Sequence, residues 1–255
     1  MGIIYFLVAL VATTLGSLVG LGGGVIIKPC LEFIGEYDIV SISILSSITV
    51  FSMAVVSTSK QVKKGFRPSK KIIYLAVGAI FGGVLGKSLF SLLLSGMIKS
   101  DASALQGIML IVILTIVLFQ KFLPDYDFKN IFVVTFIGLA LGTLASFLGI
   151  GGGPINVMVI MMFLNMKIKE AANASIITIL LSQFAKLVMA AIAGGIMVPG
   201  IEMVIYMIPA AILGGLLGAK FQHIAKSESL QKLFNVVLVI LIGLNIYNVY
   251  GFLNM

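Results

Sequence analysis

One glycine-rich pattern occurs twice in this chain, 129 residues apart, and each copy interrupts a long apolar segment. Ser17–Ile26 and Ser146–Ile155 share their serine and all four of their glycines. Each glycine costs about 1 kcal/mol relative to alanine in a helix interior, and Pro154 lacks an amide hydrogen. Apolar segments broken at matching positions in two halves are typical of transporters with internal repeats and discontinuous helices.

The composition places the chain in a membrane. Apolar residues make up 60% of it, charged residues 10%, and the mean hydropathy is +1.20. A soluble domain carries about 25% charged residues, so too few polar side chains are present to cover a globule. Eight apolar segments are long enough to be membrane spans. They are residues 2–27, 39–58, 72–94, 105–122, 131–164, 171–198, 203–221 and 233–253.

The repeat extends beyond the glycines. The polar steps at 46–49 and 175–178, the Gly-Gly-x-x-Gly patterns at 82–86 and 214–218, and the Leu-Gln pairs at 105 and 230 match in the same order. Such order predicts two homologous halves of four segments each, at 1–122 and 131–255, joined by a polar cytoplasmic linker at 123–130. The Gly-Gly-x-x-Gly patterns suit close helix packing.

The basic residues indicate how the halves are oriented, because Lys and Arg concentrate in cytoplasmic loops. Residues 59–71 hold six basic residues and no acid. If all eight segments cross, eight basic residues lie inside and seven outside. If each glycine-broken segment is a hairpin or re-entrant, thirteen lie inside, and only Lys28 and Lys99 lie outside. The second count favours an all-α polytopic membrane protein built from two inverted four-segment repeats.

The breaks are candidate anion sites. Helix N-termini present free amides and a positive dipole end, which bind anions without charged side chains. Lys186 near the centre of a span calls for a partner, and an anionic substrate would supply it. Asn156 directly follows the second break. The predicted substrate-binding residues are Gly22, Gly23, Gly24, Ser46, Thr49, Gly151, Gly152, Gly153, Asn156, Asn173, Ser175, Thr178 and Lys186.

Structural explanations for the same residues stay open. The glycines would also permit close helix crossing, Asn156 would also cap a helix, and Lys186 would also extend to a lipid headgroup. All nine carboxylates are expected in loops or at span edges. The sequence therefore shows no buried carboxylate relay for protons. No catalytic or metal-binding motif is present, and Cys30 is the single cysteine, so no enzyme activity, metal or cofactor is predicted.

The duplicated Gly-x-Gly-Gly-Gly motifs, the basic loop with Lys63-Lys64-Gly65 and the repeated Gly-Gly-x-x-Gly resemble the sulfite exporter TauE/SafE family, also called the toluenesulfonate uptake permease family. The resemblance covers essentially the whole chain. It implies an integral membrane transporter that moves sulfite or sulfur-containing organic anions. Members often carry a small Gly-Thr-Ser-like step on the second segment of each half. This chain has Leu45-Ser46 and Asn173-Ala174-Ser175 there, which leaves the substrate open.

The sequence therefore predicts a multi-pass secondary transporter of a prokaryotic cell membrane, which exports a small sulfur-containing anion or sulfite by alternating access. An anion channel or facilitator, and a non-transporting membrane scaffold, are the alternatives. The predicted partners are the small anion and the lipid bilayer. Nucleic acid is excluded, because the net charge of +8 follows the topology and forms no basic stripe. A coupling ion, proton or sodium, and homo-oligomerisation stay open.

Overall fold

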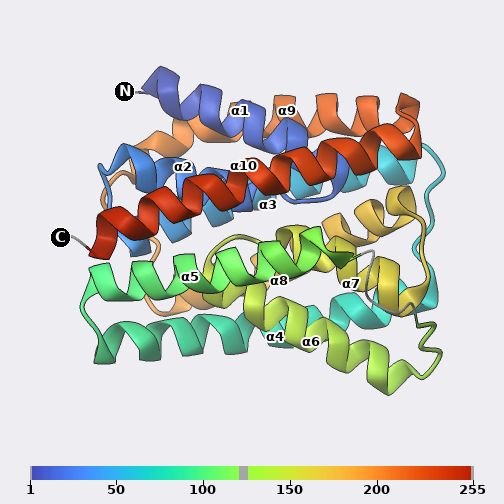
Figure 1. Cartoon of the computed structure of the whole chain (residues 1–255), viewed down its shortest axis with the longest axis horizontal. Helices are drawn as coiled ribbons and strands as arrows, with labels where there is room; N and C mark the ends of the chain where they lie inside the picture. The colour runs from blue at the N-terminus through green and yellow to red at the C-terminus, as the bar shows by residue number, and fades with distance from the viewer. Residues whose placement is uncertain (1, 121–125, 254–255) are drawn as a thin grey trace.

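The computed structural model describes residues 2–120 and 126–253, and these residues are almost entirely helical (Figure 1). The extended pairing within this part is an isolated bridge between Asp127 and Leu164. The helices are α1 (Gly2–Val19), α2 (Gly24–Ile34), α3 (Ile39–Lys63), α4 (Lys70–Gly96), α5 (Lys99–Leu118), α6 (Ile131–Leu148), α7 (Gly153–Leu164), α8 (Ile168–Ile192), the short 3₁₀ helix η2 (Ile201–Met203), α9 (Val204–Ile224) and α10 (Ser227–Leu253).

Eight helices of the described chain are long and apolar enough to cross a membrane, which confirms the predicted all-α polytopic class. The first and fifth predicted segments are each two helices. Their second members, α2 and α7, have 11 and 12 residues. At 1.5 Å per residue, they are about 16 and 18 Å long, roughly half of the hydrocarbon thickness.

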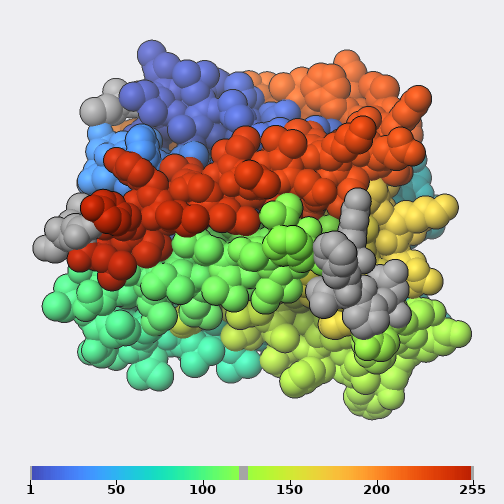
Figure 2. Space-filling view, in the orientation of Figure 1, coloured from blue at the N-terminus to red at the C-terminus, as the bar shows by residue number. Residues whose placement is uncertain are grey.

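Large apolar side chains cover the outer surface of the bundle. On α1, the exposed residues Ile3, Leu7 and Val11 recur at helical spacing. On α10, which runs between α1 and α5 across the face seen in Figure 2, Val236 and Ile240 are exposed in the same way. A soluble protein rarely exposes so much continuous apolar area. This surface fits the hydrocarbon of a bilayer.

Each glycine break turns the chain back on itself. The Tyr5 hydroxyl near the start of α1 donates to Glu36 Oε2, just beyond α2, at 2.5 Å. In the second half, the Phe128 amide before α6 donates to the Phe163 carbonyl near the end of α7 at 2.9 Å. Thus α1–α2 and α6–α7 are hairpins whose two ends lie at the same end of the bundle.

The two hairpins open at opposite ends of the molecule. The end that holds residues 35–38, 97–98 and 193–203 is called face A, where Lys99 pairs with Asp38 at 2.6 Å. The end that holds residues 64–69, 126–130 and 165–167 is called face B, where Lys71 pairs with Asp127 at 2.5 Å. The first hairpin opens at face A and the second at face B. This arrangement agrees with inverted repeats, which stay a prediction.

The halves interlock through one exchanged helix each. Helix α4 of the first half packs on α6 and α8 of the second, and α9 packs on α1 and α3 of the first (Figure 1). A Cβ added to Gly138 would overlap the Leu75 carbonyl, and one on Gly214 would lie 2.9 Å from the Leu10 carbonyl. Glycines thus bring these helix backbones together, and Gly214 belongs to one of the Gly-Gly-x-x-Gly patterns for which this role was predicted.

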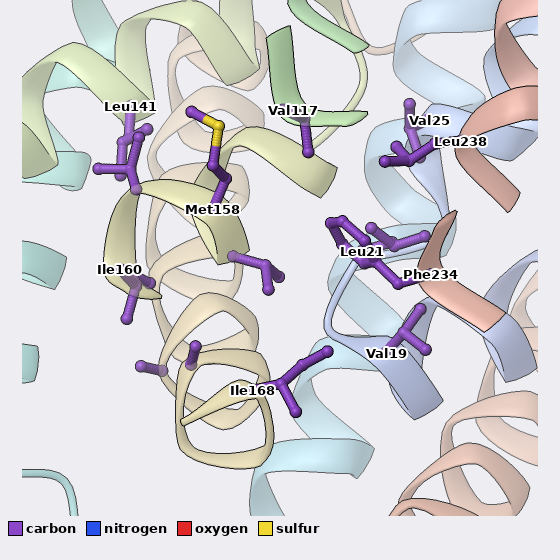
Figure 3. Close-up of a cluster of buried hydrophobic side chains, with 14 of the residues drawn as sticks. Val19, Leu21, Val25, Val117, Leu141, Met158, Ile160, Ile168, Phe234 and Leu238 are labelled. Carbon is purple, nitrogen blue, oxygen red and sulfur yellow. The ribbon is translucent and has the colours of Figure 1, made fainter. Parts of the chain in front are cut away.

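Apolar side chains fill the space between the hairpins and the helices around them. Figure 3 shows Leu21 and Val25 of the first hairpin opposite Phe234 and Leu238 of α10. Met158 and Ile160 of α7 belong to the same buried cluster. The short helices are therefore enclosed by protein, which is where a bilayer tolerates broken backbone.

We predict that Gly138→Ala strongly destabilises the purified protein. The methyl group would overlap the Leu75 carbonyl in the α4–α6 contact, and overpacking typically costs about 1–3 kcal/mol. The matched control is Gly243→Ala on the exposed side of α10, where a Cβ meets nothing within 4 Å. Thermal unfolding in detergent should give a lower Tm for the first variant and an unchanged or higher Tm for the control. Equal Tm values would contradict the packing argument.

We also predict that face B lies in the cytoplasm, because the six basic residues of 59–71 lie at this face. In a Cys30→Ser background, Met197→Cys would report face A and Glu228→Cys would report face B. A membrane-impermeant maleimide should label the former in intact cells and the latter only after permeabilisation. The reverse pattern would overturn the orientation.

Candidate functional site

The two glycine breaks lie in direct contact at the centre of the bundle. A Cβ on Gly153 would lie 3.3 Å from the Leu21 carbonyl oxygen, and one on Gly24 would overlap the Ile150 carbonyl. A Cβ on Gly22 would lie 3.5 Å from the Gly151 carbonyl oxygen. The two breaks therefore touch, and this conformation is closed between them.

The glycines at the breaks adopt backbone conformations that other residues rarely adopt. The φ angles of Gly22 and Gly23 are 77° and 78°, and those of Gly151 and Gly152 are 75° and 100°. Helices α2 and α7 begin directly afterwards, and Pro154 occupies the first turn of α7, where its missing amide hydrogen costs no helical hydrogen bond. The first amides of a helix have no partner within it, so each break presents donors to the protein interior.

Three of the predicted site hydroxyls are used by the fold itself. Ser175 Oγ donates to the Gly20 carbonyl at 2.7 Å, which secures the end of α1. Thr49 Oγ1 donates to Leu45 within α3 at 2.7 Å, and Thr178 Oγ1 to Ala174 within α8 at 3.0 Å. These hydrogens are not free for a ligand.

Other buried polar groups near the second break have no hydrogen-bond partner among the described residues. Both amide atoms of Asn156 are unpaired, and so are both of Gln183 and the Ser46 hydroxyl. Asn156 is 1% exposed and its amide lies beside Gly152, whereas Gln183 is 0% exposed and lies beside Gly151. Unpaired buried amides are costly, and each such group in a native protein calls for an explanation.

Lys186 supplies a positive charge close to these amides. It is 1% exposed, and its Nζ donates to Ser43 Oγ at 2.8 Å. Ser43 in turn lies against Gly149, the residue that ends α6. The ion pairs of the described chain do not include Lys186. Helix α8 ends at Ile192 instead of 198, so Lys186 is about 9 Å from its face-A end and not at the span centre.

The central polar site is thus defined by Gly151, Gly152, Asn156, Gln183 and Lys186, with Ser46 nearby on α3. Gln183 was missing from the predicted set. Its position one helical turn before Lys186, in an apolar span, is the signal that could have placed it there.

Asn173 lies elsewhere. It lines a cavity of about 130 Å³ at face B together with Gln61, Lys64, Lys169, Gln222 and His223. A residue of the predicted site therefore belongs to a cation-lined vestibule. Of the predicted glycines in the first break, Gly22 and Gly24 face the second break, whereas Gly23 packs against Ala12 and Thr13 of α1.

Two charged residues are not where the sequence suggested. Lys28 was expected outside and Glu32 at a span edge. Both lie within α2, with side chains 4% and 5% exposed, and pair at 3.7 Å. They are enclosed because α2 folds back into the bundle rather than leaving it.

Broken helices that enclose a buried polar site, in a bundle with an apolar outer surface, define a polytopic membrane transporter. The family model described as sulfite exporter TauE/SafE matches residues 5–246, and the chain belongs to this family. It is 24% identical to the probable membrane transporter protein YunE of Bacillus subtilis (strain 168), over 94% of this chain and 95% of that protein. No solved structure matches the chain. The protein is accordingly a multi-pass transporter of the cell membrane.

We predict that Gln183→Met stabilises the ligand-free protein. The substitution removes two unpaired amide atoms and keeps the side-chain length, and an unsatisfied buried group costs about 1–3 kcal/mol. Ser175→Ala is the matched control, because it breaks a hydrogen bond worth about 1 kcal/mol and should destabilise. Thermal unfolding of both variants without added anion checks the prediction. A loss of stability in Gln183→Met would mean that the amide is satisfied.

Proposed function

We propose that the protein binds a small oxyanion at the central polar site and carries it across the membrane as a secondary transporter. The observation that carries this proposal is the group of unpaired buried amides of Asn156 and Gln183 next to an ammonium without a carboxylate partner. Amide hydrogens and an ammonium are donors that suit the oxygens of an anion. The first amides of α7 would add donors from the backbone.

The substrate class follows from this chemistry together with the family. A site with several donors and one balancing lysine fits a compact anion such as sulfite or the sulfonate group of an organic anion. Glycine at 151 and 152 would let the oxygens approach the backbone closely. The face-B vestibule, with Lys64 and Lys169, would attract such anions from the cytoplasm.

Alternating access is the transport mode that we infer. The hairpins open at opposite faces and meet through their breaks, so separating the breaks on one side would expose the site to that side. One cavity of about 130 Å³ lies at face B, and another of about 220 Å³ lies at face A. Rocking of one hairpin against the other around a fixed site is how many inverted-repeat transporters work.

Thermal stability of the purified protein with a panel of anions tests the proposal. The panel contains sulfite, sulfate, thiosulfate, taurine, sulfoacetate, an aryl sulfonate and lactate. A ligand that binds the folded state alone stabilises it by RT ln(1 + [L]/Kd), about 2.7 kcal/mol at a hundredfold excess over Kd. We expect a Tm increase for sulfur oxyanions, and its loss in Asn156→Leu and in Lys186→Met.

The matched control is Lys226→Met, which removes an exposed lysine at face B and should keep the full Tm increase. A Tm increase that survives in Lys186→Met would remove this lysine from the site. Stabilisation by no anion in the panel would favour the scaffold alternative. Binding followed by uncoupled, downhill flux in proteoliposomes would favour the channel.

A further inference from the structure

The buried ion pair in α2 lies outside the central polar site. Lys28 Nζ donates to the Leu148 carbonyl at 2.7 Å and also to Gln106 Oε1 of α5. Glu32, one helical turn further along α2, is its ion-pair partner. Asn248 of α10 donates to the Pro29 carbonyl at 2.8 Å and lies beside the Glu32 carboxylate. Residues of four helices thus enclose one charged pair.

The Lys28 ammonium lies at a helix end whose electrostatic potential favours cations. Leu148 is the last residue of α6, where the unpaired carbonyls carry the negative end of the helix dipole. In transporters with broken helices, such carbonyl ends coordinate the coupling cation. Here a tethered ammonium fills that position. A free sodium ion would have to compete with a covalently attached charge, which leaves the proton as the coupling ion that fits.

Glu32 provides the group on which such a proton would bind. Its Oε1 has no hydrogen-bond partner among the described residues, and Lys28 lies 3.7 Å away, beyond hydrogen-bond distance. The residue also lines the face-A cavity of about 220 Å³. The residue thus lies between a space large enough for water and the buried ammonium.

The two neighbouring carboxylates, Glu36 and Asp38, already have partners of their own. Glu36 accepts from Tyr5, and Asp38 pairs with Lys99 at 2.6 Å across the cavity. Partial burial acts to raise the pKa of Asp38, but hydrogen bonds from Lys99 and Ser41 outweigh it and lower the pKa overall. Asp38 thus keeps its negative charge at lower pH than an ordinary aspartate. The other titratable groups around α2 are Cys30, Tyr37 and Tyr247. Lys186 also interacts with Lys28 through its charge.

We propose that Glu32 is a proton-binding site that couples anion transport to the proton gradient. A hydronium ion in the face-A cavity would give its proton to the Glu32 carboxylate and leave as water. The pair would change from zero net charge to +1, held on Lys28 at the end of α6. Gly149, at the same end, adjoins the central polar site, so the added charge would favour a bound anion. The coupling part of this inference rests on the proposed function.

Infrared spectroscopy tests the proton site without any substrate. During a titration of the reconstituted protein from about pH 9 to about pH 4, we expect a carboxylic acid C=O band from a buried group. The band should be missing in Glu32→Gln and retained in Glu228→Gln, which alters an exposed carboxylate at face B. In Lys28→Gln it should appear at higher pH, because the neighbouring positive charge is gone. A wild-type spectrum identical to that of Glu32→Gln would overturn the proposal.

Proteoliposomes test the coupling. Thiosulfate and an aryl sulfonate are suitable probes, because the charge of each anion does not change over this pH range and any pH effect then belongs to the protein. We expect the ratio of pH-gradient-driven accumulation to anion counterflow to fall about ten-fold in Glu32→Gln, within the usual range of coupling between sites. An unchanged ratio would overturn the coupling. If wild-type protein moves none of the anions, the proposed function fails, while the infrared titration still decides the proton site.

Discussion

The contact between the two glycine breaks is the constraint on which the rest of the structure depends. Breaking a helix inside a bilayer exposes backbone donors and acceptors that lipid cannot satisfy. The fold meets this requirement by placing each break against the other, with Leu21 beside Gly153 and Ile150 beside Gly24. Any side chain larger than hydrogen at these glycines would separate the backbones. The remaining helices enclose this contact and keep it away from lipid.

The breaks also explain where the polar groups lie. At the end of α6, Lys28 and, through Ser43, Lys186 both approach the same helix terminus. Two buried ammonium groups near a carbonyl end are favoured by its dipole, although each still costs desolvation. At the corresponding end of α1, the Ser175 hydroxyl donates to Gly20 instead. The two breaks therefore differ, because buried lysines lie at the end of α6 and a serine hydroxyl lies at the end of α1.

Much of the fold could be predicted from the sequence, because apolar length and glycine are strong local signals. The broken segments, the start of α7 at Pro154 and the packing role of the Gly-Gly-x-x-Gly patterns all follow from backbone chemistry. The enclosure of Lys28 and Glu32 could not be predicted in this way. A lysine four residues after a break looks like a loop residue until α2 is known to fold back among α3, α5 and α10.

The site was only partly predictable for a similar reason. Ser175, Thr49 and Thr178 have the residue types of a polar site, but whether a hydroxyl is free depends on which carbonyl lies next to it. Asn173 shares a helix with Lys186, yet it lies near the face-B end while Lys186 lies near the other. Gln183 has a sequence signal in its position one turn before Lys186, but only the structure shows that both of its amide atoms are unpaired. The substrate-binding residues as a set stay a prediction.

The exchange of α4 and α9 between the halves has a consequence for biogenesis. Helix α1 is synthesised before the other described helices, but its glycine-lined partner, α9, follows almost 200 residues later. Until then, the buried Thr13 and Ser17 of α1 lack their contacts with Ala210 and Gly215. The first half therefore stays in the membrane as an incomplete assembly until the second half is inserted. Only then do Thr13 and Ser17 of α1 gain their contacts with α9.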